Sequence, residues 1–201
     1  MWLVEVRLRV LGIMDNRANI LNCALQLFAS KGYDGVGVQE IVDAAGVTKP
    51  TLYHYFGSKG GLLEALLADY FDPFLISLEE AAVYRRDLPL TLNLLASSYF
   101  QFAEEKRMYY RMILSMWFAP VESVAYEAVS RLNDKQQELL EGVFMQASRD
   151  YGYMKGRQRA YAATFLGMIH SYIGLALNGY VRLDDELVVR AVHQFMYGIF
   201  S

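Results

Sequence analysis

Five polar side chains that can donate hydrogen bonds are concentrated in one short stretch. They are Lys49, Thr51, His54, Tyr55 and Lys59. At helical spacing they point away from Leu52 and Phe56, which form an apolar pair on the opposite side of the same helix. Lysine, hydroxyl and imidazole groups are the side chains that contact phosphates and base edges in nucleic acids. The pattern favours a surface that contacts something large, and it is not explained by core packing alone.

Two short helices and a tight turn are predicted to position these side chains. Val38, Ile41, Val42 and Ala45 share one face of the first helix, and Gly46 ends it in the left-handed conformation. Thr48 is a good N-cap for the second helix, and Pro50 suits its first turn. A helix, a glycine turn and a second helix make up the helix-turn-helix unit, whose second helix enters the DNA major groove.

The chain resembles the TetR family of bacterial transcriptional regulators over roughly Arg17 to Leu66. The matching residues are Arg17, Ile20, Leu21, Ala24, Leu27, Phe28, Gly32, Tyr33, Ile41, Ala45, Gly46, Val47, Thr51, Leu52, Tyr53, Phe56, Lys59 and Leu62. The resemblance implies an all-α fold, with a three-helix head at 15–60 and a larger body for ligand binding and dimerisation at 61–201. One departure is Gly37, where the family usually has a threonine or serine that caps the next helix.

Most of the predicted DNA contacts lie on the second helix of the helix-turn-helix unit. Lys49, Pro50, Thr51 and His54 are the base-edge candidates, together with Gln39. Lysine suits guanine, the proline ring and threonine methyl suit a thymine methyl, and histidine suits an acceptor. By resemblance, the phosphate contacts are expected to be Thr48, Tyr53, Tyr55 and Lys59. A two-fold dimer would place two such helices about 34 to 36 Å apart.

Composition limits the alternatives. The chain is 54% hydrophobic with a net charge of -3, and its single cysteine, Cys23, fits a reducing cytoplasm. Residues 1–60 hold six Lys or Arg and five Asp or Glu, a net charge of +1, so the head is only marginally basic. The three histidines are far apart and no nucleophile has a triad context. We therefore expect no enzyme, no metal and no cofactor.

The first 14 residues have no counterpart in the family pattern. Apolar and charged residues alternate as in a strand, yet no second strand is predicted anywhere. We expect a leader that is disordered or a start-site artefact, with Met14 as the natural start and Asp15 or Asn16 capping the first helix, 17–31. The alternative is a basic arm whose Arg7 and Arg9 enter the minor groove.

The remainder is predicted to be helical throughout. The expected helices are 62–71, 73–84, 89–105, 107–118, 120–151, 157–180 and 184–200, with Pro73, Pro89 and Pro120 at boundaries. Residues 160–181 lack charged side chains and meet the length criterion for a membrane span. Polar residues within them and a stripe of small residues favour helix packing instead. The predicted homodimer interface comprises Ala163, Gly167, Ser171, Gly174, Val188, Val192 and Phe195.

The body is also rich in large adaptable side chains. The predicted lining of a ligand pocket is Phe71, Phe102, Met112, Met116, Trp117, Tyr126, Phe165, Met168 and Tyr172. Each of these residues alone is better explained as core, but together they suit a small hydrophobic or aromatic effector. We expect a cytoplasmic, dimeric repressor that leaves double-stranded operator DNA when the effector binds. The rival is a hydrophobic-ligand carrier or protein-binding module that keeps the head as scaffold.

Overall fold

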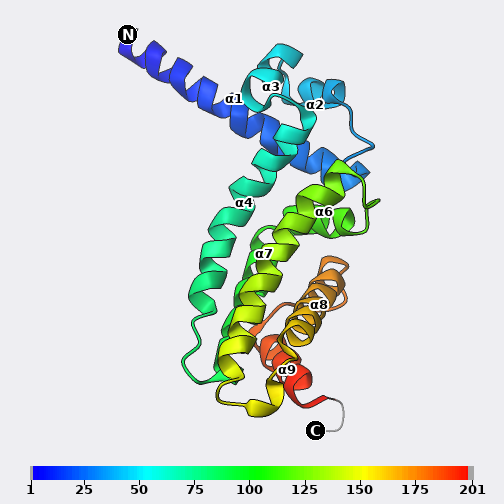
Figure 1. Ribbon diagram of the computed structural model, residues 1–201. Coiled ribbons are helices and arrows are strands. Elements are labelled where there is room, and N and C mark those ends of the chain that lie inside the picture. The colour runs from blue at the N-terminus through cyan, green and yellow to red at the C-terminus, as the bar shows by residue number, and fades with distance from the viewer. Residues whose placement is uncertain (1, 199–201) are drawn as a thin grey trace.

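Helices account for the whole architecture of the part of the chain that the structure describes. The computed structural model describes residues 2–198, and there it contains nine α-helices, a short 3₁₀ helix and no strand (Figure 1). The all-α class is confirmed. The bounds are α1 Trp2–Lys31, α2 Val38–Ala45, α3 Lys49–Phe56, α4 Lys59–Ala81, α5 Leu88–Glu105, α6 Arg107–Trp117, α7 Val124–Ala147, η1 Gly152–Met154, α8 Gln158–Leu177 and α9 Asp185–Tyr197.

The head consists of the second half of α1 with α2 and α3. Ile20 and Phe28 of α1, Ile41 of α2 and Leu52 of α3 are completely buried, so the three helices share one small core. Gly37 is the N-cap of α2 without a side-chain hydrogen bond, as its missing hydroxyl implies. Helix α2 ends at Gly46, whose φ of 64° is the left-handed conformation predicted for the turn.

Helix α1 is longer than predicted. It runs without a break from Trp2, so the expected cap at Asp15 or Asn16 is wrong, and so is the strand-like interpretation of the alternation before it. The physical reason is that a lone strand is not stable without a partner strand, whereas a helix forms its hydrogen bonds within one segment. The first turns of α1 project beyond the head (Figure 1). Whether residues 1–13 belong to the native protein stays a prediction.

Helix α4 connects head and body, and it does not stop at Pro73. The predicted boundary there is wrong, because α4 continues through the proline to Ala81. Proline has no N–H, so the carbonyl of Asp69 loses its intrahelical donor. The buried face nevertheless continues beyond the proline, with Leu67 and Phe71 before it and Phe74 and Leu78 after it. This apolar burial keeps the helix continuous.

Three further contacts link the head, the connecting helix α4 and the rest of the body. The C-terminal part of α1 packs against α6. The Arg17 guanidinium of α1 donates two hydrogen bonds to Asp69 of α4, at 2.9 and 3.1 Å. Arg131 of α7 pairs with Glu64 of α4 at 2.9 Å. In Figure 1, α4 and α7 run side by side down the body, and α8 and α9 lie at its far end. A shift of α4 or α6 would therefore be felt by the head.

Candidate DNA-binding surface and ligand cavity

Helix α3 is built to expose its first turn. The Thr48 hydroxyl accepts a hydrogen bond from the Thr51 backbone N–H at 3.4 Å, and Pro50 occupies the first turn, as predicted. Leu52 and Phe56 anchor the helix, with 0% and 9% of their surface exposed. The sequence therefore fixes which side of α3 faces outward.

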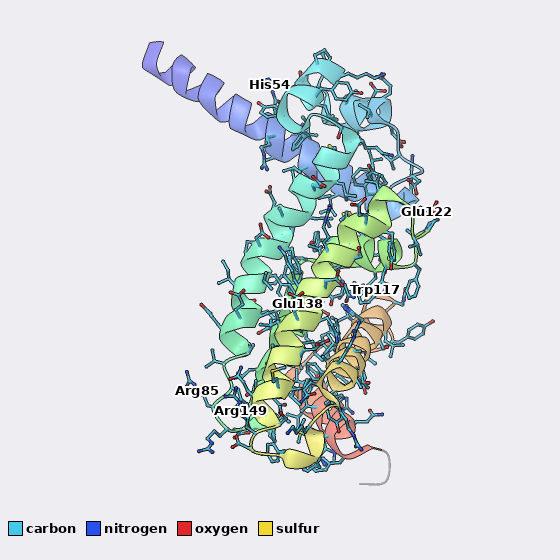
Figure 2. The ribbon with its side chains drawn as sticks, in the orientation of Figure 1. His54, Arg85, Trp117, Glu122, Glu138 and Arg149 are labelled. Atoms are coloured by element: carbon cyan, nitrogen blue, oxygen red, sulfur yellow. The ribbon has the colours of Figure 1, made fainter. Side chains whose placement is uncertain are left out.

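The predicted base contacts lie on that outer side. Lys49, Pro50 and His54 are exposed, and Thr51 is half-buried, with its hydroxyl 2.9 Å from that of Thr48. Figure 2 shows His54 at the head end of the molecule, far from Arg85 and Arg149 at the opposite end. The four base-contact candidates, Lys49, Pro50, Thr51 and His54, all lie on the short helix α3.

The remaining DNA candidates are placed less uniformly. Tyr53 is exposed, whereas Tyr55 is half-buried, with its ring edge-on to His54 at 5.4 Å between ring centres. Gln39 of α2 is exposed, and its amide donates to the Asp43 carboxylate at 2.7 Å. Gln39 must give up that bond to contact a base.

Lys59, a predicted phosphate contact, has partners within the protein. Its ammonium donates to the backbone carbonyls of Tyr33 and Val36, at 3.0 and 2.9 Å, and lies 4.1 Å from the centre of the Tyr33 ring. These carbonyls belong to the loop between α1 and α2, so Lys59 fastens that loop to the start of α4. These two bonds leave one N–H donor and the positive charge of the ammonium, so the phosphate contact of Lys59 stays a prediction.

Lys59→Met separates a structural from a phosphate role. Methionine keeps the apolar stem but removes the donor of both carbonyls, so we expect the free energy of unfolding to fall by about 1 to 3 kcal/mol. Lys31→Met is the matched control, because Lys31 forms an exposed ion pair with Glu40 and should contribute about 1 kcal/mol or less. Urea unfolding measures both. Unchanged stability together with a shallower salt dependence of DNA binding would assign Lys59 to phosphate instead.

A cavity of about 550 Å³ lies in the body between α6, α7 and α8. Leu114, Trp117 and Phe118 line it from the end of α6, and Asn133 and Gln137 line it from α7. The wall from α8 is made of Ala163, Leu166, Gly167, His170, Ser171 and Gly174. Trp117 is labelled in the body in Figure 2, below the head. Because α6 also packs against α1, this cavity shares a helix with the DNA-binding head.

The predicted pocket residues do not surround one cavity. Only Trp117 lines the cavity just described. Met168 and Tyr172 line a second one, of about 740 Å³, next to α9, and Phe102 lines a groove between α4 and α5, where its ring stacks on Phe74. Phe71, Met112, Met116 and Phe165 are core residues, while Tyr126 is half-buried at the start of α7; none of these five lines a cavity described here. A single pocket lined by the predicted set is therefore not observed.

Two polar residues of the 550 Å³ cavity, Asn133 and Gln137, were missed in the sequence. Asn133 lies four residues after Val129 and seven before Leu140, so it shares the inward stripe of α7 with buried apolar residues. A polar side chain at such a position is the signal that could have identified it, because an amide in an apolar stripe needs a partner.

His170 is the one titratable side chain in the described lining of that cavity. The imidazole Nδ1 lies 2.9 Å from the Tyr110 hydroxyl, and its ring packs edge-on against Trp117 at 4.7 Å. Burial lowers the pKa of His170 from 6.5 to about 4. The ring is therefore neutral at neutral pH.

This lowered pKa predicts a loss of stability in acid. The unfolded chain takes up a proton on His170 below about pH 6.5, whereas the folded chain does so only near pH 4. Stability is therefore fully present above the unfolded pKa and decreases as pH falls toward the folded one. At about pH 5 the contribution lost is about 2 kcal/mol. Urea unfolding of the wild type and of His170→Gln, each at neutral pH and at about pH 5, measures this loss. Between the two conditions the free energy of unfolding of the variant should fall by about 2 kcal/mol less than that of the wild type. Equal losses would contradict the burial of this ring.

The predicted dimer interface is divided between surface and core. Ala163, Gly167 and Ser171 are exposed on α8, in agreement with a surface available to a second subunit. Val188 and Val192 are not available, because α9 packs this face onto α5 and leaves them 6% and 2% exposed. Their assignment to the interface is wrong. Phe195 is half-buried against Phe144 and Phe165 in the same protomer.

Helix α8 is also long and apolar enough, by length and composition, to cross a membrane. Its inward residues Ala162, Phe165, Leu166, Ile169 and Ile173 pack into the core of the body. The apolar character of α8 is explained by this packing on one side and by small residues on the other.

Comparisons with known proteins agree with this geometry. Residues 20–66 match the family model for bacterial regulatory proteins of the tetR family. The chain is 28% identical over 184 residues to the HTH-type transcriptional activator FasR of Mycolicibacterium smegmatis. The aligned residues cover 92% of this chain and 82% of that protein. It is 26% identical over 139 residues to the HTH-type transcriptional repressor KstR2 of Rhodococcus jostii, covering 69% of this chain and 68% of that protein.

Solved structures show the same fold. The transcriptional regulator FadR of Bacillus subtilis, in complex with stearoyl-CoA, aligns with a TM-score of 0.74 at 20% identity and covers 90% of this chain and 98% of its own. AibR, in complex with isovaleryl coenzyme A and operator DNA, aligns with a TM-score of 0.68 at 22% identity, covering 91% and 98%. An exposed second helix on a compact head, joined to a separate helical body, defines a helix-turn-helix transcriptional regulator. Residues 20–66 are thus similar to the DNA-binding part of bacterial regulatory proteins of the tetR family, and the fold of the chain is that of the solved regulators.

Proposed function

We propose that this regulator is a cytoplasmic, dimeric repressor that is released from its operator by a small hydrophobic effector. The observation that carries the proposal is the pairing of an exposed α3 with an apolar cavity that shares α6 with the head. The relatives support both halves: one is a named repressor, and two structural neighbours hold acyl-CoA ligands, one of them together with operator DNA. FasR is a named activator, so the sign of regulation is the part that needs a direct test.

In the proposed complex, the N-terminal half of α3 lies in the major groove. Lys49 contacts guanine, Pro50 and the Thr51 methyl contact a thymine methyl, and His54 contacts an acceptor. Thr48, Tyr53 and Tyr55 contact phosphates, and the positive end of the helix dipole assists them. The exposed α8 stripe of small residues pairs with its copy in the second subunit, which then covers the side of the 550 Å³ cavity that this stripe lines. This pairing sets the spacing of the two α3 helices.

Release requires the effector to prefer the arrangement that does not bind DNA. A shift of the population from 1:99 to 99:1 needs a preference of about 5.5 kcal/mol. The structure offers a short mechanical route: the cavity wall at Leu114 and Trp117 belongs to α6, and α6 contacts α1. A ligand that moves α6 also moves the helix to which α2 and α3 are anchored.

A hydrophobic-ligand carrier is the second candidate, and the near-neutral head favours it. A net charge of +1 over residues 1–60 gives little general attraction to DNA. A carrier would use the same cavity, but it would not enrich any duplex from a random pool. DNA selection therefore separates the two functions without knowledge of the effector.

The experiment has two steps. Random DNA duplexes are first selected with the purified protein. The affinity of the protein for the enriched duplex is then measured with and without fractions of lipophilic extracts. We expect one enriched sequence and at least one extract fraction that weakens binding by tenfold or more. Enrichment without any responsive fraction would contradict the sensor half of the proposal, and no enrichment would support the carrier.

A further inference from the structure

The side chain of Asn19 joins α1 to the end of α2. Its amide Nδ2 donates a hydrogen bond to the backbone carbonyl of Ala45 at 2.8 Å, across 26 positions of the sequence. Ala45 is the last residue of α2, and the last four carbonyls of a helix have no donor within that helix. Ala45 is also buried, where a carbonyl without a partner costs free energy. Asn19 therefore supplies a bond that α2 cannot supply itself.

The surroundings of Asn19 hold its amide in one orientation. A carbonyl oxygen only accepts hydrogen bonds, so the nitrogen of the amide must face Ala45. The amide oxygen lies 3.7 Å from the thiol of Cys23, one turn further along α1. Asn19 is half-buried, and the next residue, Ile20, is completely buried in the core of the head. The donor is thus presented to α2 from a fixed support.

Helix propensity does not explain an asparagine at this position. Asn19 lies in the interior of α1, which runs from Trp2 to Lys31. In a helix interior asparagine is less favourable than alanine, leucine or lysine, because its amide competes for backbone hydrogen bonds. The contact with Ala45 accounts for the residue, since none of those better helix formers except lysine carries a donor and lysine is too long for so close a contact.

The base-reading turn of α3 depends on the segment just before it. The first three residues of α3, 49–51, precede Leu52, which is the first buried residue of this helix. Their direction is therefore set from the turn at 46–48 and not by core contacts of their own. That turn is held by the half-buried Val47, and it begins directly after the carbonyl to which Asn19 is bonded. A displacement of Ala45 would shift the start of α3.

We propose that Asn19 is a positioning residue for DNA recognition. It holds the turn between α2 and α3 against α1, and it thereby fixes the direction in which Lys49, Pro50 and Thr51 meet the base edges. The inference rests on the proposed DNA-binding function and adds to it a residue that touches no DNA itself. Loss of the bond leaves the base-reading side chains in place but allows them to meet the groove at several angles, so sequence preference relaxes.

The specificity ratio of the full-length protein tests this role. It is the affinity for the enriched duplex divided by the affinity for versions changed at one base pair, measured by equilibrium gel shifts. Partial unfolding lowers both affinities equally, so a merely structural role leaves the ratio unchanged. Asn19→Leu removes the donor at similar size, and Asn19→Asp removes it at the same shape. We expect each to lower operator affinity by about tenfold and the ratio by about fivefold.

Two further variants complete the design. Asn19→Gln keeps an amide donor and should restore part of the ratio. Asn93→Leu is the matched control, because the Asn93 amide donates to the Pro89 carbonyl at the same distance of 2.8 Å, but within α5 of the body. The control should leave the ratio within about twofold. Thermal unfolding identifies a variant that fails to fold, and the other variant at position 19 then decides.

An unchanged specificity ratio in both Asn19→Leu and Asn19→Asp would overturn the inference, and so would an equal loss in Asn93→Leu. These results leave the wild type sequence-specific, so the regulator function stands and only the role of Asn19 fails. If the wild-type protein enriches no duplex at all, the regulator function and the role of Asn19 fail together. The two failures are therefore distinguishable from the wild-type measurement alone.

Discussion

Lys49→Ala should weaken binding to the enriched duplex by about 1 to 3 kcal/mol for each subunit and remove the preference at one base pair of each half-site. Lys49 opens α3, is exposed, and has no role in the core of the head. A dimer loses the contact twice, so the affinity should fall by about 30-fold or more. Equilibrium gel shifts on the enriched duplex, and on versions changed at one base pair, measure both effects.

A matched lysine separates this contact from a general loss of charge. Lys155 is exposed in the body, outside the head, and Lys155→Ala removes the same charge. Its effect should be within about twofold, and it should leave base preference unchanged. If Lys49→Ala lowers affinity equally for every sequence, Lys49 is a phosphate contact, and the proposed direct recognition of guanine is wrong.

Gly167→Arg should separate the two subunits and abolish tight operator binding. Gly167 is exposed on α8, and a Cβ added there meets no atom of the same protomer within 4 Å, so the protomer tolerates a side chain. In the proposed interface the same position lies where two helices approach closely, and a buried unpaired arginine there costs about 3 kcal/mol or more. Sedimentation velocity and gel shifts give the two readouts.

Ile76→Arg is the control for this change. Ile76 is an exposed apolar residue of α4, 58% exposed, and it lies outside the proposed interface. We expect a dimer and normal operator binding. A dimeric Gly167→Arg protein with unchanged operator affinity would mean that the subunits associate through another surface.

The helical elements could be predicted from sequence because their signals are local. Periodic apolar residues, Thr48 as a cap and Gly46 as a turn residue each act within a few positions, and each is observed as predicted. Pro73 shows the limit of local reasoning. A proline is a boundary signal on its own, but the buried face of α4 extends past it and tertiary packing decides.

The site could be predicted only in part, because sequence does not say which apolar face meets which neighbour. The α9 stripe containing Val188 and Val192 was predicted to face a second subunit, but it is buried in the same protomer, where α9 packs on α5. Lys59 looked like a surface cation, and its contact with two loop carbonyls depends on the fold. Asn133 and His170 lie on different helices, so their shared cavity is visible only in three dimensions.

Footprinting of the enriched duplex tests most directly whether two copies of α3 read one DNA molecule. Because α3 is exposed and the proposed dimer is two-fold, two protected major-groove patches are predicted on the same side of the duplex, about 34 to 36 Å apart. Their sequences should be inverted repeats. A single protected patch, or protection without symmetry, would contradict the account.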